Sequence, residues 1–228
     1  MKTTILSIIF STAMSFTTLA QDCSTFYPFF EGAKTQITTY DKRGRVSAVS
    51  DYVVTSVTGT SNNKTAALTV IIKDERDREL VTSEYDLKCN GDAVSIDFKS
   101  MVGPQFGEQF RDMEYEITGT NLVYPNNMSI GNQLPDAAMQ MQINMSGINM
   151  NLNMAVTDRK VIAKESVTVP AGTYECFVIE YNVSVEMGLN RNSKSKQWIA
   201  RGVGLVKQED YNGGGRITSS SKLTAFSR

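Results

Sequence analysis

Methionine thioethers are the most concentrated set of side chains in this sequence that could bind a ligand. Five of the 11 methionines lie in one short segment, Met139 to Met154, which reads MQMQINMSGINMNLNM. Thioether clusters select Cu(I), but such sites usually add cysteine or histidine, and this segment contains neither. Methionine is also flexible and polarizable, which suits irregular packing or contact with apolar molecules. We therefore predict no metal and interpret the segment as an apolar wall, either a plain core or a surface that admits an apolar ligand.

The same segment has the alternating pattern of a β-hairpin that turns at Ser146-Gly147. One face then pairs only apolar residues, with Met141 opposite Leu152, and the other face pairs only amides, with Gln142 opposite Asn151. A slip of one residue would move every side chain to the other face, so the pattern predicts one register. The predicted apolar wall consists of Met139, Met141, Ile143, Met145, Ile148, Met150, Leu152 and Met154.

The sequence offers few side chains that could carry out acid–base or nucleophilic catalysis. The chain has no histidine, which removes Ser-His-Asp and Cys-His catalysis and imidazole metal sites. Glutamates and aspartates are scattered, and no spacing selects the two facing carboxylates that a glycosidase needs. No glycine-rich loop leads into a helix that could hold a phosphate. We expect no enzyme and no cofactor, with a carboxylate-based hydrolase as the least favoured alternative.

The three cysteines are Cys23, Cys89 and Cys176. No CxxC spacing occurs, so thioredoxin-like chemistry and a cysteine zinc site are not expected. In an oxidising compartment, one disulfide and one remaining thiol are the natural expectation. Cys89 lies on the apolar phase of its predicted strand, Cys176 lies on the polar phase of its own, and Cys23 could reach either. We favour a Cys23–Cys89 disulfide, and the alternative is three reduced, partly buried thiols.

The N-terminus predicts export. Lys2 precedes an apolar run, and Thr18-Leu19-Ala20 is a small-residue cleavage site, so residues 1–20 read as a signal peptide and residues 21–228 as a single all-β domain. Asp22 stands where a lipobox needs a small residue before Cys23, so we expect a soluble periplasmic or extracellular protein and not a lipoprotein. No transmembrane segment is expected. The net charge of −1 and the lack of a strongly basic stretch disfavour nucleic acid as a partner.

The rest of the chain alternates strand and turn signals. Asn90-Gly91 and Pro170-Ala-Gly172 are turns, and the longest alternating run predicts one strand from Phe177 to Leu189. The single predicted helix is Met101 to Asp112. About a dozen antiparallel strands must curl to cover an apolar face and limit exposed edges. The predicted fold is therefore all-β, a curved antiparallel sheet forming an open half barrel with one short helix, with a two-sheet β-sandwich as the alternative.

Three segments share one turn pattern. Tyr40 to Arg45, Lys73 to Arg78 and Tyr211 to Arg216 align without gaps, and Asp or Asn holds the second position of each. A type I turn followed by a left-handed residue selects this pattern, which predicts three hairpins built in the same way. A serine follows each arginine after five residues, at Ser50, Ser83 and Ser221.

Longer motifs resemble a known family. Val169-Pro-Ala-Gly-Thr-Tyr-Glu-Cys176, Trp198-Ile-Ala-Arg-Gly-Val-Gly-Leu-Val206 and Leu134-Pro-Asp-Ala-Ala-Met139 are similar to the TapB-like proteins, a family of exported bacterial β-proteins of unknown function. The similarity extends from Cys23 and Tyr27-Pro28 to the last predicted strand. The resemblance implies a bacterial envelope or secreted location and a curved antiparallel sheet, and it supplies no active site.

Two functions are open on these grounds. The first is an exported, non-enzymatic barrel-like protein whose concave apolar face binds a lipid-like or other apolar small molecule, or a strand of an envelope protein. The second is a structural or protein-interaction module of the envelope with a filled core. A Met-rich wall favours the first, because a filled core usually has bulkier, better-fixed residues.

Overall fold

Thirteen strands form one antiparallel sheet in the computed structural model, which describes residues 23–101, 114–145 and 148–228. The strands are β1 (Lys34–Asp41), β2 (Val46–Thr60), β3 (Asn63–Lys73), β4 (Glu79–Cys89), β5 (Ala93–Ile96), β6 (Glu114–Thr120), β7 (Leu122–Pro125), β8 (Ala137–Met145), β9 (Ile148–Val169), β10 (Gly172–Met187), β11 (Leu189–Ala200), β12 (Gly204–Tyr211) and β13 (Ile217–Ser227). A single 3-10 turn, η1 (Phe98–Met101), lies between β5 and β6 in the described part of the chain.

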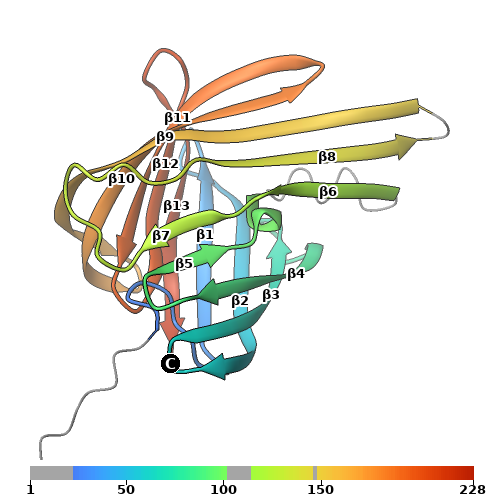
Figure 1. Ribbon diagram of the computed structural model, residues 1–228. Helices are drawn as coiled ribbons and strands as arrows, with labels where there is room; N and C mark the ends of the chain where they lie inside the picture. Colours follow the sequence, from blue (N-terminus) through green and yellow to red (C-terminus); the bar gives the residue numbers. More distant parts are fainter. Residues whose placement is uncertain (1–22, 102–113, 146–147) are drawn as a thin grey trace, which may run out of the picture.

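The sheet curls into a nearly closed barrel with one open seam (Figure 1). The strand order is β6-β8-β9-β10-β11-β12-β13-β1-β2-β3-β4-β5-β7, so β6 and β7 are the two edges. These edge strands are joined by Asn121 alone, which brings the two ends of the sheet together. The prediction of an all-β, curved antiparallel barrel is confirmed, and the sandwich alternative is wrong. Most of the predicted helix, residues 102–112, lies outside the described residues.

The predicted methionine hairpin is confirmed in register. β8 and β9 pair Met139 with Met154 and Met141 with Leu152. The hairpin extends away from the barrel beside β6 (Figure 1). Its predicted turn, residues 146–147, lies outside the described residues.

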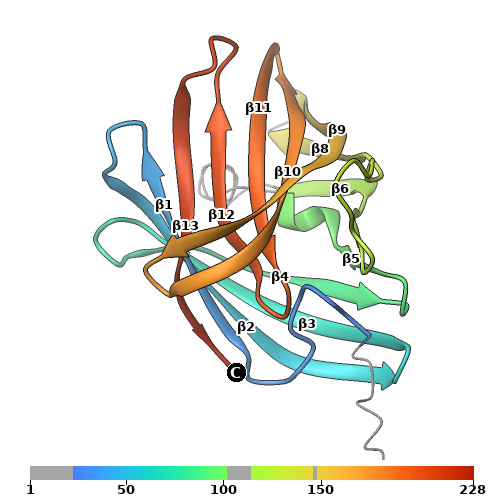
Figure 2. The same cartoon turned by 90° about the vertical axis from the view of Figure 1, so that its left-hand side faces the viewer.

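The chain has two main apolar cores because both faces of β10 are covered. Phe177 and Ile179 point into the barrel core, whereas Cys176 and Val178 belong to a second core with Trp198. The β9–β10 hairpin folds over β12 and β13 to make this second core (Figure 2). Cys176 is therefore fully buried, and its assignment to a polar strand face was wrong, because the sequence does not show which strand covers that face.

The three hairpins with the shared turn pattern are confirmed. Asp41 Oδ1 accepts hydrogen bonds from the backbone N–H of Arg43 at 2.8 Å and of Arg45 at 3.0 Å. Asp74 and Asn212 accept the equivalent pairs of bonds in their own turns. Because neighbouring strands are antiparallel, these turns lie at one end of the sheet, between β1 and β2, β3 and β4, and β12 and β13.

One strand boundary differs from the prediction. The alternating run from Phe177 does not continue to Leu189, because the chain reverses at Gly188, where φ is 74°. Met187 at the end of β10 therefore pairs with Leu189 at the start of β11. An apolar residue on each side of a one-residue reversal mimics an uninterrupted strand in the sequence.

Candidate ligand-binding cavity

The barrel encloses a cavity of about 280 Å³. Its walls come from β2–β5 on one side and from β7, β11, β12, β13 and β1 on the other, with η1 at its rim. Two of the lining side chains, Ser83 on β4 and Lys99 on η1, are exposed, so the cavity communicates with solvent. The interior of the barrel is thus not completely filled by side chains.

The wall formed by β2, β3 and β4 is mainly apolar. β3 contributes Leu68, Val70 and Ile72, which alternate inward along the strand. Tyr52 on β2 and Tyr85 on β4 flank them. Burial raises the pKa of Tyr52 above its ordinary value and that of Tyr85 well above it, so these phenols are neutral hydrogen-bonding groups at physiological pH.

The opposite wall carries a row of uncharged polar side chains. Gln197, Gln208, Ser221 and Thr39 are successive cross-strand partners on β11, β12, β13 and β1, and all four line the cavity. Gln197 Nε2 donates to Gln208 Oε1 at 2.9 Å, and the hydroxyls of Thr39 and Ser221 are 2.9 Å apart. We call these four residues the polar row. The cavity therefore has one apolar wall and one hydrogen-bonding wall.

The N-terminal segment closes the end of the barrel opposite the three shared turns. Tyr27 and Pro28 from this segment line the cavity. Gly204 permits the Tyr27 ring to pack there, because a Cβ on Gly204 would lie 2.8 Å from two ring carbons. The Tyr27 and Tyr124 rings are 5.5 Å apart, and Tyr124 Oη donates to Gln197 Oε1 at 2.9 Å, which connects this end to the polar row.

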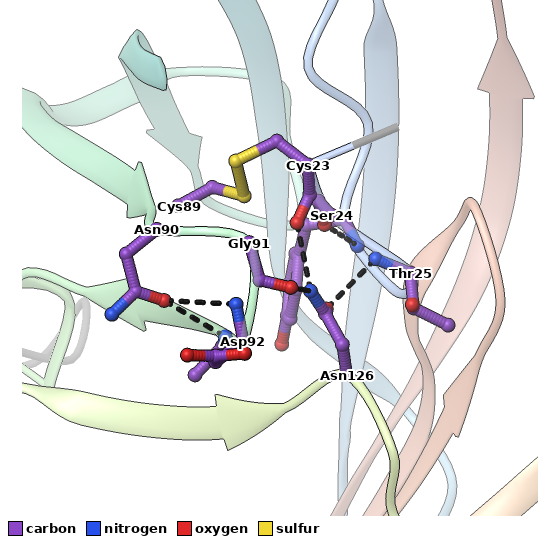
Figure 3. The surroundings of a disulfide bond; sticks show 10 residues. Cys23, Ser24, Thr25, Cys89, Asn90, Gly91, Asp92 and Asn126 are labelled. Atoms are coloured by element: carbon purple, nitrogen blue, oxygen red, sulfur yellow. Dashed lines mark hydrogen bonds between the residues drawn. A yellow bond between two sulfur atoms is a disulfide. The ribbon is translucent and has the colours of Figure 1, made fainter. Parts of the chain in front are cut away.

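A disulfide and one asparagine fasten the N-terminal segment to the barrel (Figure 3). Cys23 is bonded to Cys89 at the end of β4, as the sequence predicts, with Cα atoms 5.8 Å apart. Asn126 Nδ2 donates to the carbonyl oxygens of Cys23 at 2.7 Å and Gly91 at 2.8 Å. Its Oδ1 accepts from the backbone N–H of Thr25 at 2.9 Å. The segment is thus bound by covalent and hydrogen bonds and not by apolar packing alone.

Arg159 is a buried cation behind one wall of the cavity. Its side chain is 1% exposed, and Nη1 donates to the carbonyl oxygens of Val123 at 3.1 Å and Pro135 at 2.7 Å. Its guanidinium carbon lies 4.9 Å from the centroid of the Tyr124 ring. Its Nη2 is buried and has no hydrogen-bond partner among the described residues. Arg159 does not line the cavity, whereas the Tyr124 ring that it contacts does.

The predicted methionine wall lies elsewhere. Met139, Met141, Ile143 and Leu152 are buried in the barrel core, at most 2% exposed. Met150 and Met154 are partly buried against the same core. Among the predicted wall residues whose side chains the structure describes, none lines the barrel cavity, although Met139 and Met154 border a separate shallow groove. The side chains of Met145 and Ile148 lie outside the described residues. A ligand-binding role for this wall stays a prediction.

The cavity residues were missed at the level of sequence, although one signal pointed to them. Ser50, Ser83 and Ser221, the serines that follow the three shared turns, all line the cavity. Equal distance from equivalent turns places them at comparable depths on the inner face. The shared turn pattern alone accounts for the repeated spacing of these serines in the sequence. That the serines face the interior of the barrel depends on how the three hairpins assemble.

Other reactive groups do not form a site in the described residues. Cys176 is a buried free thiol, and desolvation together with Glu175 and Glu165 raises its pKa to about 11, so it is unreactive at neutral pH. No group of three or more cysteine, aspartate or glutamate side chains in the described ranges could hold a metal ion. No described helix is long and apolar enough to cross a membrane.

The fold and the cavity define a nearly closed antiparallel barrel with a solvent-accessible interior. The chain belongs to the DUF3108-like family, whose model matches residues 30–223. This match does not carry the TapB-like name that the motifs suggested. No characterised protein sequence matches the chain significantly.

Two solved structures share the fold. One, from Bacteroides fragilis, is described as exported with a YmcC-like fold; the TM-score is 0.78 at 19% identity, covering 90% of this chain and 100% of the other. The second, from Parabacteroides distasonis, is described as a lipoprotein. Its TM-score is 0.76 at 22% identity, and the match covers 91% of this chain and 100% of the other. Because that relative is described as a lipoprotein, the absence of a lipid anchor here stays a prediction.

Proposed function

We propose that this protein is an exported, non-enzymatic binding protein that holds a lipid-like, amphipathic molecule inside its barrel. The observation that carries the proposal is the cavity of about 280 Å³ between an apolar and a polar wall. This volume is close to the lower end of ligand pockets, which run from about 300 to 1,000 Å³. A purely structural barrel would gain stability by filling this space with side chains. The sequence contains no histidine, so the usual neutral general base is missing from the chain.

The neutral fluorophore N-phenyl-1-naphthylamine is a suitable probe, because its fluorescence rises in an apolar environment. We expect saturable binding to residues 21–228. Thr35 on β1 lines the cavity and is partly exposed, so Thr35→Phe narrows the cavity with little risk to the core. This variant should bind the probe at least tenfold more weakly. Thr168→Phe, the same change at an exposed position of β9, is the matched control and should bind like wild type.

Equal affinity for wild type, Thr35→Phe and Thr168→Phe would place the probe outside the barrel and contradict the proposal. Native mass spectrometry of the protein gently extracted from its own envelope provides an independent measurement. A co-purifying molecule with an acyl chain supports the proposal, and a ligand-free mass counts against it.

The second candidate function is an envelope interaction module. The burial of Met141 and Leu152 in the core favours it, because those residues then stabilise the projecting hairpin and are not presented to a ligand. A ligand-free mass together with absent probe binding is the result that this alternative predicts.

A further inference from the structure

We infer that the cavity selects ligands with an uncharged hydrogen-bonding head group, such as a hydroxyl or a primary amide, over ligands that end in a carboxylate. This inference rests on the proposed function and specifies the chemical class of its ligand. It follows from the polar row and from the position of the charged groups around it.

The polar row is continuous across four strands. Gln197 pairs with Gln208, Gln208 with Ser221, and Ser221 with Thr39 in the registers of the sheet. The four side chains share the inner face and line the cavity. A ligand that spans the cavity therefore meets amides and hydroxyls on one side and the apolar residues of β3 on the other.

The polar row has hydrogen-bonding capacity beyond its internal bonds. A primary amide has two N–H donors, and Gln208 Nε2 uses one of them toward Asp210 Oδ1 at 3.0 Å. The bond between the Thr39 and Ser221 hydroxyls uses one hydroxyl proton, and each oxygen has two lone pairs. A ligand hydroxyl or amide can both donate to and accept from such groups, whereas a carboxylate can only accept.

Negative charge beside the polar row opposes an anionic head group, because Asp210 lies two residues along β12 from Gln208 and pairs with Ser195 and Ser219. The Asp210 carboxylate accepts from Ser195 Oγ at 2.7 Å and Ser219 Oγ at 2.6 Å, as well as from Gln208. It therefore orients the Gln208 amide while its own charge stays satisfied by hydrogen bonds. Placing a second carboxylate against that amide would bring like charges together in a partly buried site, which is unfavourable.

Two cationic side chains near the cavity, Lys99 and Arg159, could instead favour a ligand with an anionic head group. Lys99 is the one charged side chain that lines the cavity in the described chain, and it is exposed at the rim. Arg159 lies behind the Tyr124 ring, outside the lining. Neither adjoins the polar row in the strand register. A carboxylate bound at Lys99 would be exposed to water, where ion pairs contribute little.

The test is displacement of N-phenyl-1-naphthylamine from residues 21–228 by decyl compounds with equal chains. The competitors are 1-decanol, decanamide and decanoate at pH 8, where the acid is ionised. We expect 1-decanol and decanamide to bind at least tenfold more tightly than decanoate. The probe itself has no such head group, so its binding reports the cavity independently of head-group selectivity.

Two variants remove parts of the polar row. Thr39→Val with Ser221→Ala deletes both members of a hydroxyl pair, so neither is left without its partner, and Gln208→Leu removes one amide. Each should reduce the preference for 1-decanol over decanoate at least fivefold, with the affinity of each competitor calculated from the variant's own affinity for the probe. The matched control is Thr168→Val with Thr173→Ala, which deletes an exposed cross-strand hydroxyl pair whose oxygens are 2.9 Å apart. It should keep the wild-type preference.

Thermal melting establishes that each variant is folded, and the Thr39/Ser221 variant keeps the test decisive if Gln208→Leu does not fold. Tighter binding of decanoate than of 1-decanol, lost in Lys99→Gln, would overturn the inference and leave the proposed function intact. Equal selectivity in wild type and in the polar-row variants would also overturn it. Failure of wild type to bind the probe would refute the proposed function and the inference together.

Discussion

Met141 of β8 lies directly opposite Leu152 of β9, and neither side chain is more than 2% exposed. The pair is in the barrel core, although the hairpin that carries it projects from the barrel. Apolar cross-strand contacts therefore hold the two strands of the hairpin together, and their removal has a measurable consequence for stability.

Leu152→Ala should lower the free energy of unfolding by about 2–5 kcal/mol, because the deleted atoms leave a cavity in a fully buried site. Urea denaturation followed by circular dichroism measures the change. Leu189→Ala is the matched control; Leu189 is 74% exposed, and its truncation should change stability by less than about 0.5 kcal/mol. If the two substitutions have the same effect, Leu152 is not a core residue.

Loss of the Cys23–Cys89 disulfide should lower the free energy of unfolding by about 2–5 kcal/mol, because the bond closes a loop with a sequence separation of 66 residues and restricts the unfolded chain. The double variant Cys23→Ala, Cys89→Ala shows this in urea denaturation. Dithiothreitol should destabilise wild type to a similar degree and leave the double variant unchanged. Destabilisation of both proteins by dithiothreitol would mean that the effect has another source.

Gly204→Ala should destabilise the protein by more than about 1 kcal/mol, because φ is +89° and the new methyl would contact the Tyr27 ring. Probe binding should weaken as well, since displaced Tyr27 lines the cavity. Gly213→Ala serves as the control, with no heavy atom within 4 Å of the added Cβ. Equal melting temperatures for the two variants would show that the Tyr27 ring does not require the glycine.

The Asp41 turn should make stability depend on pH in the acid range. Hydrogen bonds from the backbone and side chain of Arg45 lower the pKa of Asp41 to about 2. An unfolded aspartate has a pKa of about 3.9, so the stabilisation is present above that pH and is lost as the pH falls through about 2. Asp41→Asn should keep the turn, as Asn212 does in the third hairpin, but lose this pH dependence.

Melting temperatures between pH 2 and 6 measure the effect of Asp41→Asn. The difference between wild type and variant should be largest above pH 4 and should shrink toward pH 2. A difference that is constant with pH would show that the carboxylate charge has no role in the turn.

Local features of the fold were predictable because they depend on neighbours in the chain. The methionine hairpin has one register that sorts apolar from amide side chains, and Met141 meets Leu152 accordingly. The turn at Asp41 follows from its side chain bonding to nearby N–H groups. The apolar phase of Cys89 on β4 favours a Cys23–Cys89 pairing, although the sequence also allows Cys23 to reach Cys176, and the structure has the favoured pair.

The features that were missed depend on which faces meet. Alternation along β10 distinguishes two faces of the strand, and Cys176 lies on the face that carries polar residues in the sequence. The sequence does not show that both faces of β10 are buried, one in each apolar core. The predicted ligand wall was placed on the methionines because they are the most conspicuous apolar face. The cavity instead lies where strands distant in sequence meet, as Thr39 and Ser221 do across 182 residues.

The amino-acid sequence by itself determined the all-β class, the methionine register and the three shared turns, because each follows from alternation or turn chemistry along the chain. Only the tertiary structure decided where space remains inside the barrel. That space depends on the closure of the sheet from β6 to β7 and on the packing of the N-terminal segment against Gly204. Volume enclosed between distant strands is a property of their assembly and has no local signature in any one of them.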